Sequence, residues 1–245
     1  ALDGPGAITL TGNLVASGTA GTSSGWGGTA VITINGSGDQ SITGTTDTGV
    51  VFNRLPAAVV NKSTGTLTIA NTIQPRSGWT YTTGTLSIGT STFEFNALQT
   101  ITGTMSMYNL KMIKSGNTTS TITIASGTTL TVTNTLTLDK TNVQSSEALD
   151  GPGAITLTGN LVASGLAGTS SGWGGSAVIT INGTGSQSIT GTTDTGQIYN
   201  RVPSVVIAKS TGTLTFTNNI LFNTNFTYTS GTYSIGTSEV MQALR

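Results

Sequence analysis

Residues 1–18 read ALDGPGAITLTGNLVASG, and residues 148–165 repeat these eighteen letters without a change. The match continues further along the chain. Residues 1–91 and 148–238, aligned without gaps, are identical at 68 of 91 positions. A long internal period indicates a repeat architecture, in which similar units stack on one another. The period of 147 residues is therefore the first constraint on the fold.

Apolar and hydroxyl side chains alternate with a period of two in most of the chain. The stretch TLTVTNTLTL at residues 129–138 sets four aliphatic side chains against a row of threonines. In AITLTGNLV, near the start, Ile8 and Leu10 share one face in the same way. This alternation is typical of half-buried strands, and no segment shows the 3.6-residue period of a helix. We therefore expect strands joined by turns, with little or no helix.

The strand pattern and the repeat together predict an all-β fold, a β-solenoid or parallel β-helix. Its first copy is residues 1–147, and a truncated second copy, residues 148–245, continues it. The alternative is a row of tandem β-sandwich domains, which have cores of large side chains. Aromatic residues make up only 6% of the chain, and a narrow solenoid interior suits the Ile, Leu, Val and Ala found here. We therefore favour the solenoid, with about 20–25 residues in each coil.

A shorter motif recurs inside the long repeat. The sequence Gln-Ser/Thr-Ile-Thr-Gly-Thr is followed first by an aromatic residue and Asn, and then by Lys and Ser. The glutamines that begin the motif are Gln40, Gln99 and Gln187, and the lysines are Lys62, Lys114 and Lys209. The spacing between the three occurrences varies, which indicates that loops of unequal length interrupt a common coil.

The composition excludes several kinds of function. The chain has 9 basic and 9 acidic residues, no His and no Cys. A net charge of zero argues against nucleic-acid binding, which needs a basic face for the phosphates. Polar residues interrupt every apolar stretch, so no membrane span is expected. Low charge also removes the repulsion that keeps proteins apart, and therefore favours self-association.

Three segments resemble the repeats of large secreted bacterial surface proteins: SGDQSITGT (residues 37–45), FNRLPAAVVNKSTGTLTIANTI (52–73) and residues 129–138. These are Thr/Gly-rich β-helical proteins of the adhesin, autotransporter-passenger and filamentous-haemagglutinin kind. The resemblance covers nearly the whole chain and rests on composition. It implies an extracellular or cell-surface rod or fibre, and it assigns no catalytic residue.

The acidic residues offer little catalytic chemistry. A glycosidase needs two carboxylates across one cleft, and Asp47 and Asp194 occupy equivalent positions in the two copies. Asp3 and Asp150 lie in Asp-Gly-Pro-Gly turns, but one carboxylate in a turn is too few for calcium, which takes six to eight oxygens. We expect structural roles for all four, no catalytic residues, and no metal or cofactor.

The tryptophans are the candidate contact residues. Trp26 and Trp173 lie in the identical text GTSSGWGG, and Trp79 is replaced by Phe226 in the second copy. A Trp among glycines can stack on a sugar, fill the interior of the rod, or contact a neighbouring subunit. We expect a ligand or subunit contact at these three tryptophans, with packing as the alternative; at Trp79 the exchange for Phe favours packing.

These observations predict a non-enzymatic extracellular structural protein. It would be a β-solenoid building block of a cell-surface filament, sheath or adhesin stalk, and it would self-associate end to end. One alternative is a module that binds polysaccharide, such as a surface glycan, or ice; rows of threonine on flat strands would supply an ice-binding surface. A polysaccharide-cleaving β-helix enzyme is a further alternative.

Overall fold

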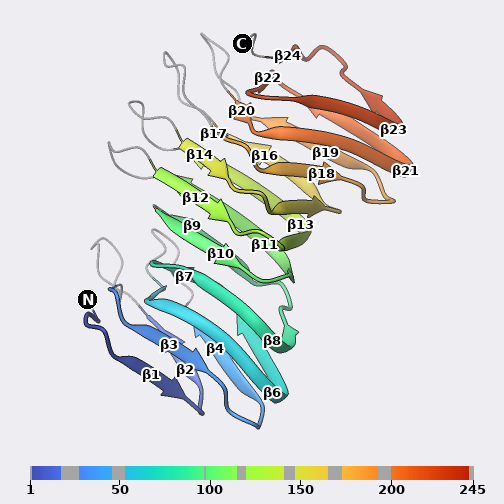
Figure 1. The fold of residues 1–245 in the computed structure, drawn as a ribbon. Helices are drawn as coiled ribbons and strands as arrows, with labels where there is room; N and C mark the ends of the chain where they lie inside the picture. The colour runs from blue at the N-terminus through green and yellow to red at the C-terminus, as the bar shows by residue number, and fades with distance from the viewer. Residues whose placement is uncertain are drawn as a thin grey trace.

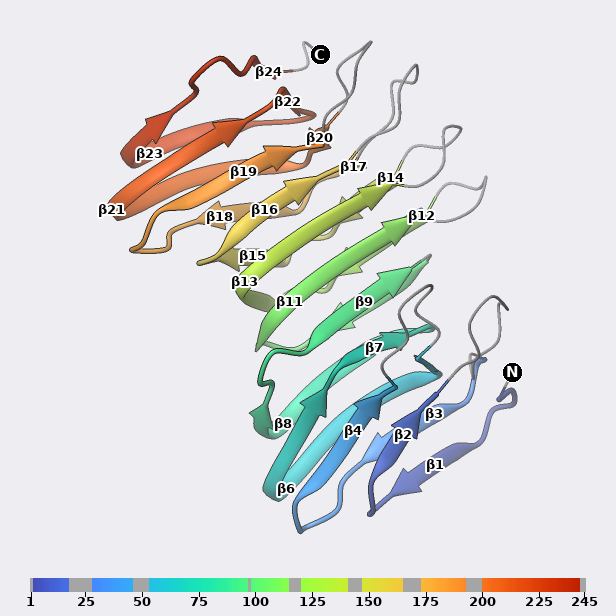
Figure 2. The ribbon, with the colours of Figure 1, turned by 180° about the vertical axis from the view of Figure 1, so that it is seen from behind.

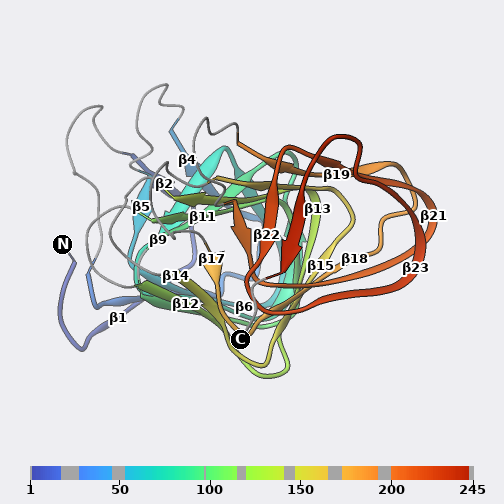
Figure 3. The ribbon, with the colours of Figure 1, turned by 90° about the horizontal axis from the view of Figure 1, so that it is seen from above.

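The chain folds into a β-solenoid, in which successive coils stack along one axis (Figure 1). The computed structural model describes residues 2–17, 28–45, 53–96, 98–114, 120–140, 147–164, 173–192 and 200–242. These residues form 24 strands and contain no helix. Viewed from above, the strands of successive coils overlie one another around a shared interior (Figure 3).

Three sheets run along the stack. The first has ten strands: β1 (Ala7–Leu10), β2 (Leu14–Ala16), β3 (Val31–Ile34), β4 (Gln40–Gly44), β6 (Ala57–Ala70), β8 (Trp79–Ser87), β10 (Gln99–Thr102), β12 (Ser120–Ile124), β14 (Glu147–Asp150) and β17 (Trp173–Gly174). The second has eleven: β5 (Arg54–Leu55), β7 (Thr72–Pro75), β9 (Thr92–Asn96), β11 (Met105–Lys114), β13 (Thr129–Lys140), β15 (Ala154–Leu157), β16 (Asn160–Ala163), β18 (Val178–Ile181), β19 (Gln187–Gly191), β21 (Ser204–Thr217) and β23 (Phe226–Ser234). The third has three: β20 (Arg201–Val202), β22 (Ile220–Phe222) and β24 (Val240–Gln242).

Every strand pairing among the described residues is parallel, and each joins one coil to the next. Ile8 lies opposite Ile32, Ile32 opposite Ala58, and Ala58 opposite Trp79. These partners are 24, 26 and 21 residues apart, as their numbers show, close to the coil length expected from the sequence. Parallel pairing of this kind rules out tandem β-sandwiches, whose sheets are antiparallel.

The interior consists of columns of apolar side chains, one from each coil. In one column, parallel register connects Leu130, Ile155, Ile179, Val205 and Phe226 in turn. The buried apolar residues form a single cluster that extends from the first coil to the last. Burying a Leu or Ile side chain contributes about 1.5–3 kcal/mol, so this column is a main source of the stability of the stack.

The alternation expected from the sequence is confirmed by the burial of individual strands. In β3, β15 and β18, every second residue is buried and the others are partly exposed. In β13, the four aliphatic residues among 129–138 have no exposed surface. The first coil differs, since Ile8, expected to point inward, is 39% exposed.

Two asparagines adopt the left-handed backbone conformation at the same point of each copy. Asn71 and Asn218 have φ of 61° and 62°. The Nδ2 of Asn71 donates to the carbonyl of Gly44, and that of Asn218 donates to the carbonyl of Gly191, both at 2.7 Å. Asn tolerates this conformation better than most residues because its side chain can bond locally.

The two copies continue into each other without a break in pairing. β12 pairs with β14, and β13 pairs with both β15 and β16, so the last strands of the first copy hold the first strands of the second (Figure 2). The repeated sequence therefore occurs in two environments, at an end of the described stack and in its middle.

Candidate functional site

The first coil exposes apolar side chains at one end of the stack. In the described part of the chain, β1 pairs only with β3, and β2 pairs only with β4. Ile8 is 39% exposed and Val15 is 66% exposed. A cavity of about 210 Å³ opens here, lined mainly by apolar residues: Leu2, Ile8, Leu10, Leu14, Val15, Ala16, Ile32, Arg54, Leu55 and Pro56. We call the exposed side of β1 and β2 the N-face.

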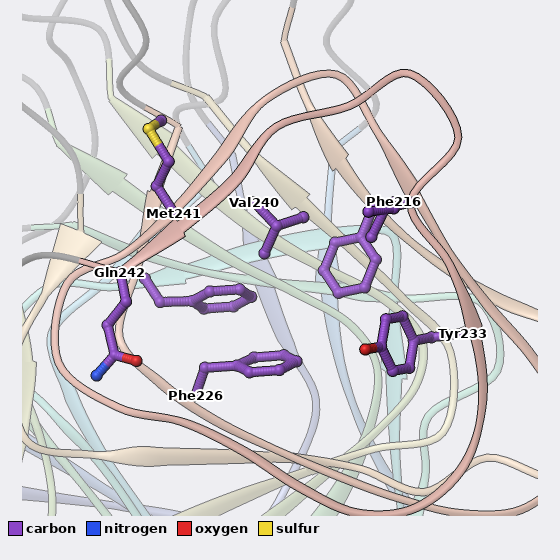
Figure 4. A pocket seen from close by; sticks show the side chains of 8 residues that line it. Phe216, Phe226, Tyr233, Val240, Met241 and Gln242 are labelled. Carbon is purple, nitrogen blue, oxygen red and sulfur yellow. The ribbon is translucent and has the colours of Figure 1, made fainter.

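The last coil ends in a cluster of aromatic residues, of which Tyr233 is exposed and Phe226 partly exposed, while Phe216 and Phe222 are buried beneath them. The rings of Phe222 and Phe226 are 4.7 Å apart, and Phe216 meets Tyr233 edge to face at 6.2 Å. These rings line a cavity of about 300 Å³. In Figure 4, Val240 points toward the rings of Phe216 and Phe226, and Met241 is directed away from them. We call this side of the coil, formed by β23 and β24, the C-face.

The exposed large apolar residues concentrate at these two faces. In the part of the chain that the structure describes there are six such residues, and five of them belong to the first or the last coil. They are Ile8, Val15, Tyr228, Tyr233 and Ile235, while Leu98 lies in the middle of the stack. Exposed apolar patches of this kind mark interaction sites. The two end faces are therefore the candidate functional site.

The structure buries two of the tryptophans, which corrects the expected contact role of Trp173 and gives Trp79 the packing role that its exchange for Phe favoured. Trp79 and Trp173 have no exposed surface, so neither indole is available to a sugar or to another subunit. The Nε1 of Trp79 lies 3.2 Å from the sulfur of Met105, and that of Trp173 donates to the carbonyl of Asp139 at 3.3 Å. Both side chains pack in the interior. Trp26 lies outside the described residues.

Trp79 fits inside the coil because the residue stacked on it is small. Ala58 is its register partner on the preceding coil. In the second copy the equivalent partners are Val205 and Phe226. Val is larger than Ala, and the Phe ring is smaller than the Trp ring. The exchange keeps the combined volume of the pair similar. The sequence shows both substitutions, but only the register shows that they face each other.

We expect this compensation to appear as coupling between two substitutions. Ala58→Val alone overpacks the interior and Trp79→Phe alone leaves space, each at a cost of about 1–3 kcal/mol in the free energy of unfolding. The double variant, which reproduces the pair of the second copy, should recover at least about 1 kcal/mol of the summed loss. Urea unfolding of the four proteins measures the coupling. If the loss of stability in the double variant equalled the sum of the two single losses, a direct contact between residues 58 and 79 would be contradicted.

The carboxylates in the Asp-Gly-Pro-Gly turns tie one coil to the next. The Oδ1 of Asp150 accepts from the backbone N–H and the hydroxyl of Ser176, at 2.8 and 3.1 Å. Asp3 accepts in the same way from the backbone N–H of Thr29 at 3.1 Å. These bonds give both aspartates a structural role. Asp47 and Asp194 lie in parts of the chain that the structure leaves undescribed.

A ladder of polar side chains crosses the first copy on the outer side of β5, β7, β9, β11 and β13. The Nε of Arg54 donates to the Oε1 of Gln74 at 3.0 Å, and the Nε2 of Gln74 donates to Glu94. Lys111 then forms an ion pair with Asp139, Nζ to Oδ2, at 3.2 Å. Each rung comes from the next coil. We call this set the polar ladder.

Burial changes the ionisation of the ladder. Glu94 is only 2% exposed, and this burial raises the pKa of its carboxyl, although Lys111 and the bond from Gln74 act in the opposite direction. Burial likewise lowers the pKa of Arg76, and the nearby charge of Arg54 adds to that effect. In the second copy, Gln74 and Glu94 are replaced by Leu221 and Met241, so the ladder is not repeated.

The raised pKa of Glu94 predicts a pH dependence of stability. The folded carboxyl binds its proton more tightly than the unfolded one, so the free energy of unfolding is highest below its ordinary pKa and falls as the pH rises above it. Glu94→Gln should remove this fall and raise stability at neutral pH by about 1 kcal/mol. Urea unfolding from about pH 4 to pH 8 measures both effects. An unchanged pH profile would contradict the assignment.

Two lysines are buried in cages of oxygen atoms that the sequence analysis did not identify. Lys62 is 1% exposed, and its Nζ donates to the carbonyls of Gly36 and Gly38 at 2.6 and 2.8 Å, and to the Oε1 of Gln40 at 2.8 Å. The amide of Gln40 in turn donates to the carbonyl of Leu10. One polar chain thus connects three successive coils through the interior.

The second copy reproduces the cage atom for atom. The Nζ of Lys209 donates to the carbonyls of Gly183 and Gly185 and to the Oε1 of Gln187, at 2.6, 2.8 and 2.6 Å. Burial lowers the pKa of Lys209. The signal was present in the recurring Gln and Lys of the short motif. These residues meet because Gln40 lies opposite Leu67 on the next coil, and Lys62 comes shortly before Leu67 and reaches back to Gln40.

The threonine rows are regular over only part of the surface. Thr131, Thr156 and Thr180 stack in register on partly exposed positions of β13, β15 and β18. The next residue in this column is Val206. In a parallel column, Thr137 is followed by Val162. Valine therefore interrupts both of these columns of hydroxyl groups.

Neither a metal cluster nor a membrane helix appears among the residues placed by the structure. No group of three or more Asp, Glu, His or Cys in these ranges is arranged to hold a metal ion. No helix in them is long and apolar enough to cross a membrane. No protein-family model, curated protein or solved structure matches the chain.

Proposed function

We propose that this chain is a non-enzymatic structural protein, a β-solenoid building block of an extracellular or cell-surface filament, sheath or adhesin stalk. It self-associates end to end, with the N-face of one molecule against the C-face of another. The observation that carries this proposal is the concentration of exposed large apolar side chains at the two faces. The extracellular setting rests on the resemblance of the repeats to bacterial surface proteins.

Three further features support a stiff rod that packs beside others. Parallel pairing connects each coil to the next along the described stack, so that backbone hydrogen bonds resist separation of the coils. The lysine cages and the polar ladder add side-chain bonds in the same direction. Charged residues make up 7% of the chain, which lowers the repulsion between neighbouring rods.

Sedimentation velocity and negative-stain electron microscopy test the proposal over a range of protein concentrations. We expect rods that lengthen with concentration. Ile8→Asp, on the N-face, and Ile235→Asp, on the C-face, should each abolish long rods, because a buried charge opposes the contact. The matched control is Leu98→Asp, which adds the same charge at a residue 69% exposed and away from both faces.

Mixing the two end variants makes the test sharper. Each variant keeps one intact face, so an equal mixture should form dimers joined by one normal contact and no longer species. A protein that stays monomeric at every concentration would contradict the proposal. Equal loss of assembly in the Leu98→Asp control would contradict the assignment of the contact to the ends.

A further inference from the structure

The N-face has a counterpart inside the stack whose covering strand is known. Residues 1–16 and 148–163 have the same sequence. In the second copy, β13 lies over this sequence in parallel register, with Leu130 opposite Ile155 and Leu136 opposite Leu161. The backbone N–H of Thr158 donates to the carbonyl of Val132 at 3.0 Å. The molecule therefore shows which segment packs on this surface.

Burial differs between the two copies as expected for an occupied and an open site. Ile155 has no exposed surface, whereas its equivalent Ile8 is 39% exposed. Leu161 is also fully buried, while Leu14 is partly exposed. The side chains are identical, so the difference comes from the strand that covers one copy and not the other.

Two glycines show that the N-face also has the shape needed for this strand. A Cβ on Gly159 would lie 1.9 Å from the carbonyl oxygen of Asn134, and one on Gly153 would lie 2.4 Å from the Cγ2 of Ile124. Only a residue without a side chain allows the covering coil to come so close. The equivalent Gly6 and Gly12 have no atom within 4 Å of such a Cβ, and so keep the same space open on the N-face.

We infer that the N-face is a docking site for an extended coil of the sequence found at residues 120–140. The segment would add to β1 and β2 as a parallel strand, with Leu130 opposite Ile8 and Leu136 opposite Leu14. Its inward aliphatic residues would fill the cavity of the face, and its backbone carbonyls would accept from the free edge. The inference goes beyond the proposed function: in a second copy of this chain residues 129–140 are paired inside the stack, so the docked coil would come from a separate partner and would compete with the C-face for the N-face.

A labelled peptide of residues 120–140, titrated into the full chain and followed by fluorescence anisotropy, tests the inference. We expect saturable binding that Gly12→Ala weakens about tenfold or more, because the new Cβ occupies the space of the docked backbone. Gly185→Ala is the matched control, because a Cβ there meets nothing within 4 Å and lies away from the N-face. A peptide with Thr at the four aliphatic positions of 129–138 should not bind.

A fused variant keeps the test decisive if the free peptide aggregates. Residues 120–147 placed before Ala1 recreate the junction that joins the two copies. Hydrogen exchange should then show new protection of the backbone amides in 7–16. Absence of peptide binding together with unprotected amides in the fused chain would overturn the inference.

The experiments distinguish a failure of this inference from a failure of the proposed function. Rods that form while neither peptide nor fused segment docks would overturn the inference alone. Docking by a chain that never self-associates would support the site and contradict the end-to-end function.

Discussion

Lys62→Met is expected to lower the free energy of unfolding by about 3 kcal/mol. The substitution keeps the length and the apolar stem of the side chain, but it removes all three donated hydrogen bonds. The carbonyls of Gly36 and Gly38 and the Oε1 of Gln40 then remain inside the coil without a donor. Each unsatisfied buried acceptor costs about 1 kcal/mol or more. Removing a buried charge offsets part of this total.

Lys111→Met is the matched control, and urea unfolding followed by circular dichroism compares the two. Lys111 is on the outside of the stack and forms an ion pair in which both side chains are partly exposed. Exposed pairs contribute less than about 1 kcal/mol, and Glu94, which also loses a neighbouring positive charge, is protonated when both variants are compared at about pH 4. The two lysines thus differ in burial while the chemical change is the same. Equal effects of the two substitutions would show that the cage adds nothing to stability.

Most of the fold could be predicted because the strand signal is local. The alternation in residues 129–138 predicted which side chains are buried, and the exact repeat at 148–165 predicted stacked units. Ile8 was the exception. Its sequence context is the same as that of Ile155, and only the position of the coil in the stack distinguishes them.

The site residues were harder to predict because they depend on contacts between coils. The contact role of Trp173 was predicted from its glycine-rich surroundings, and the packing of Trp79 from its exchange for Phe. The residue that makes space for Trp79 is Ala58, 21 residues earlier in the chain. The lysine cage needed the same kind of information. Gln40 and Lys62 were recognised as recurring residues, yet their contact required the length of the connecting coil. Unequal loops make that length impossible to read from the repeat alone.

Gly159→Ala is expected to cost about 3 kcal/mol in the free energy of unfolding, while Gly12→Ala changes it by less than about 0.5 kcal/mol. The two glycines have the same neighbours in sequence. They differ in what lies above them, since a Cβ on Gly159 would meet the backbone of Asn134 at 1.9 Å and one on Gly12 would meet nothing. The covering strand β13 is paired along its length with β11 and cannot move away without breaking that pairing.

Chemical denaturation of both variants, with hydrogen exchange to locate the weakened coil, measures this difference. In Gly159→Ala, the loss of protection should centre on β13, β15 and β16, where the two copies meet. In Gly12→Ala, exchange in the same strands should match that of the unchanged chain. If both variants lost the same stability, the glycine would be required by the local turn, and the close approach of the covering coil would not explain it. The comparison therefore separates a requirement of the sequence motif from a requirement of stacking.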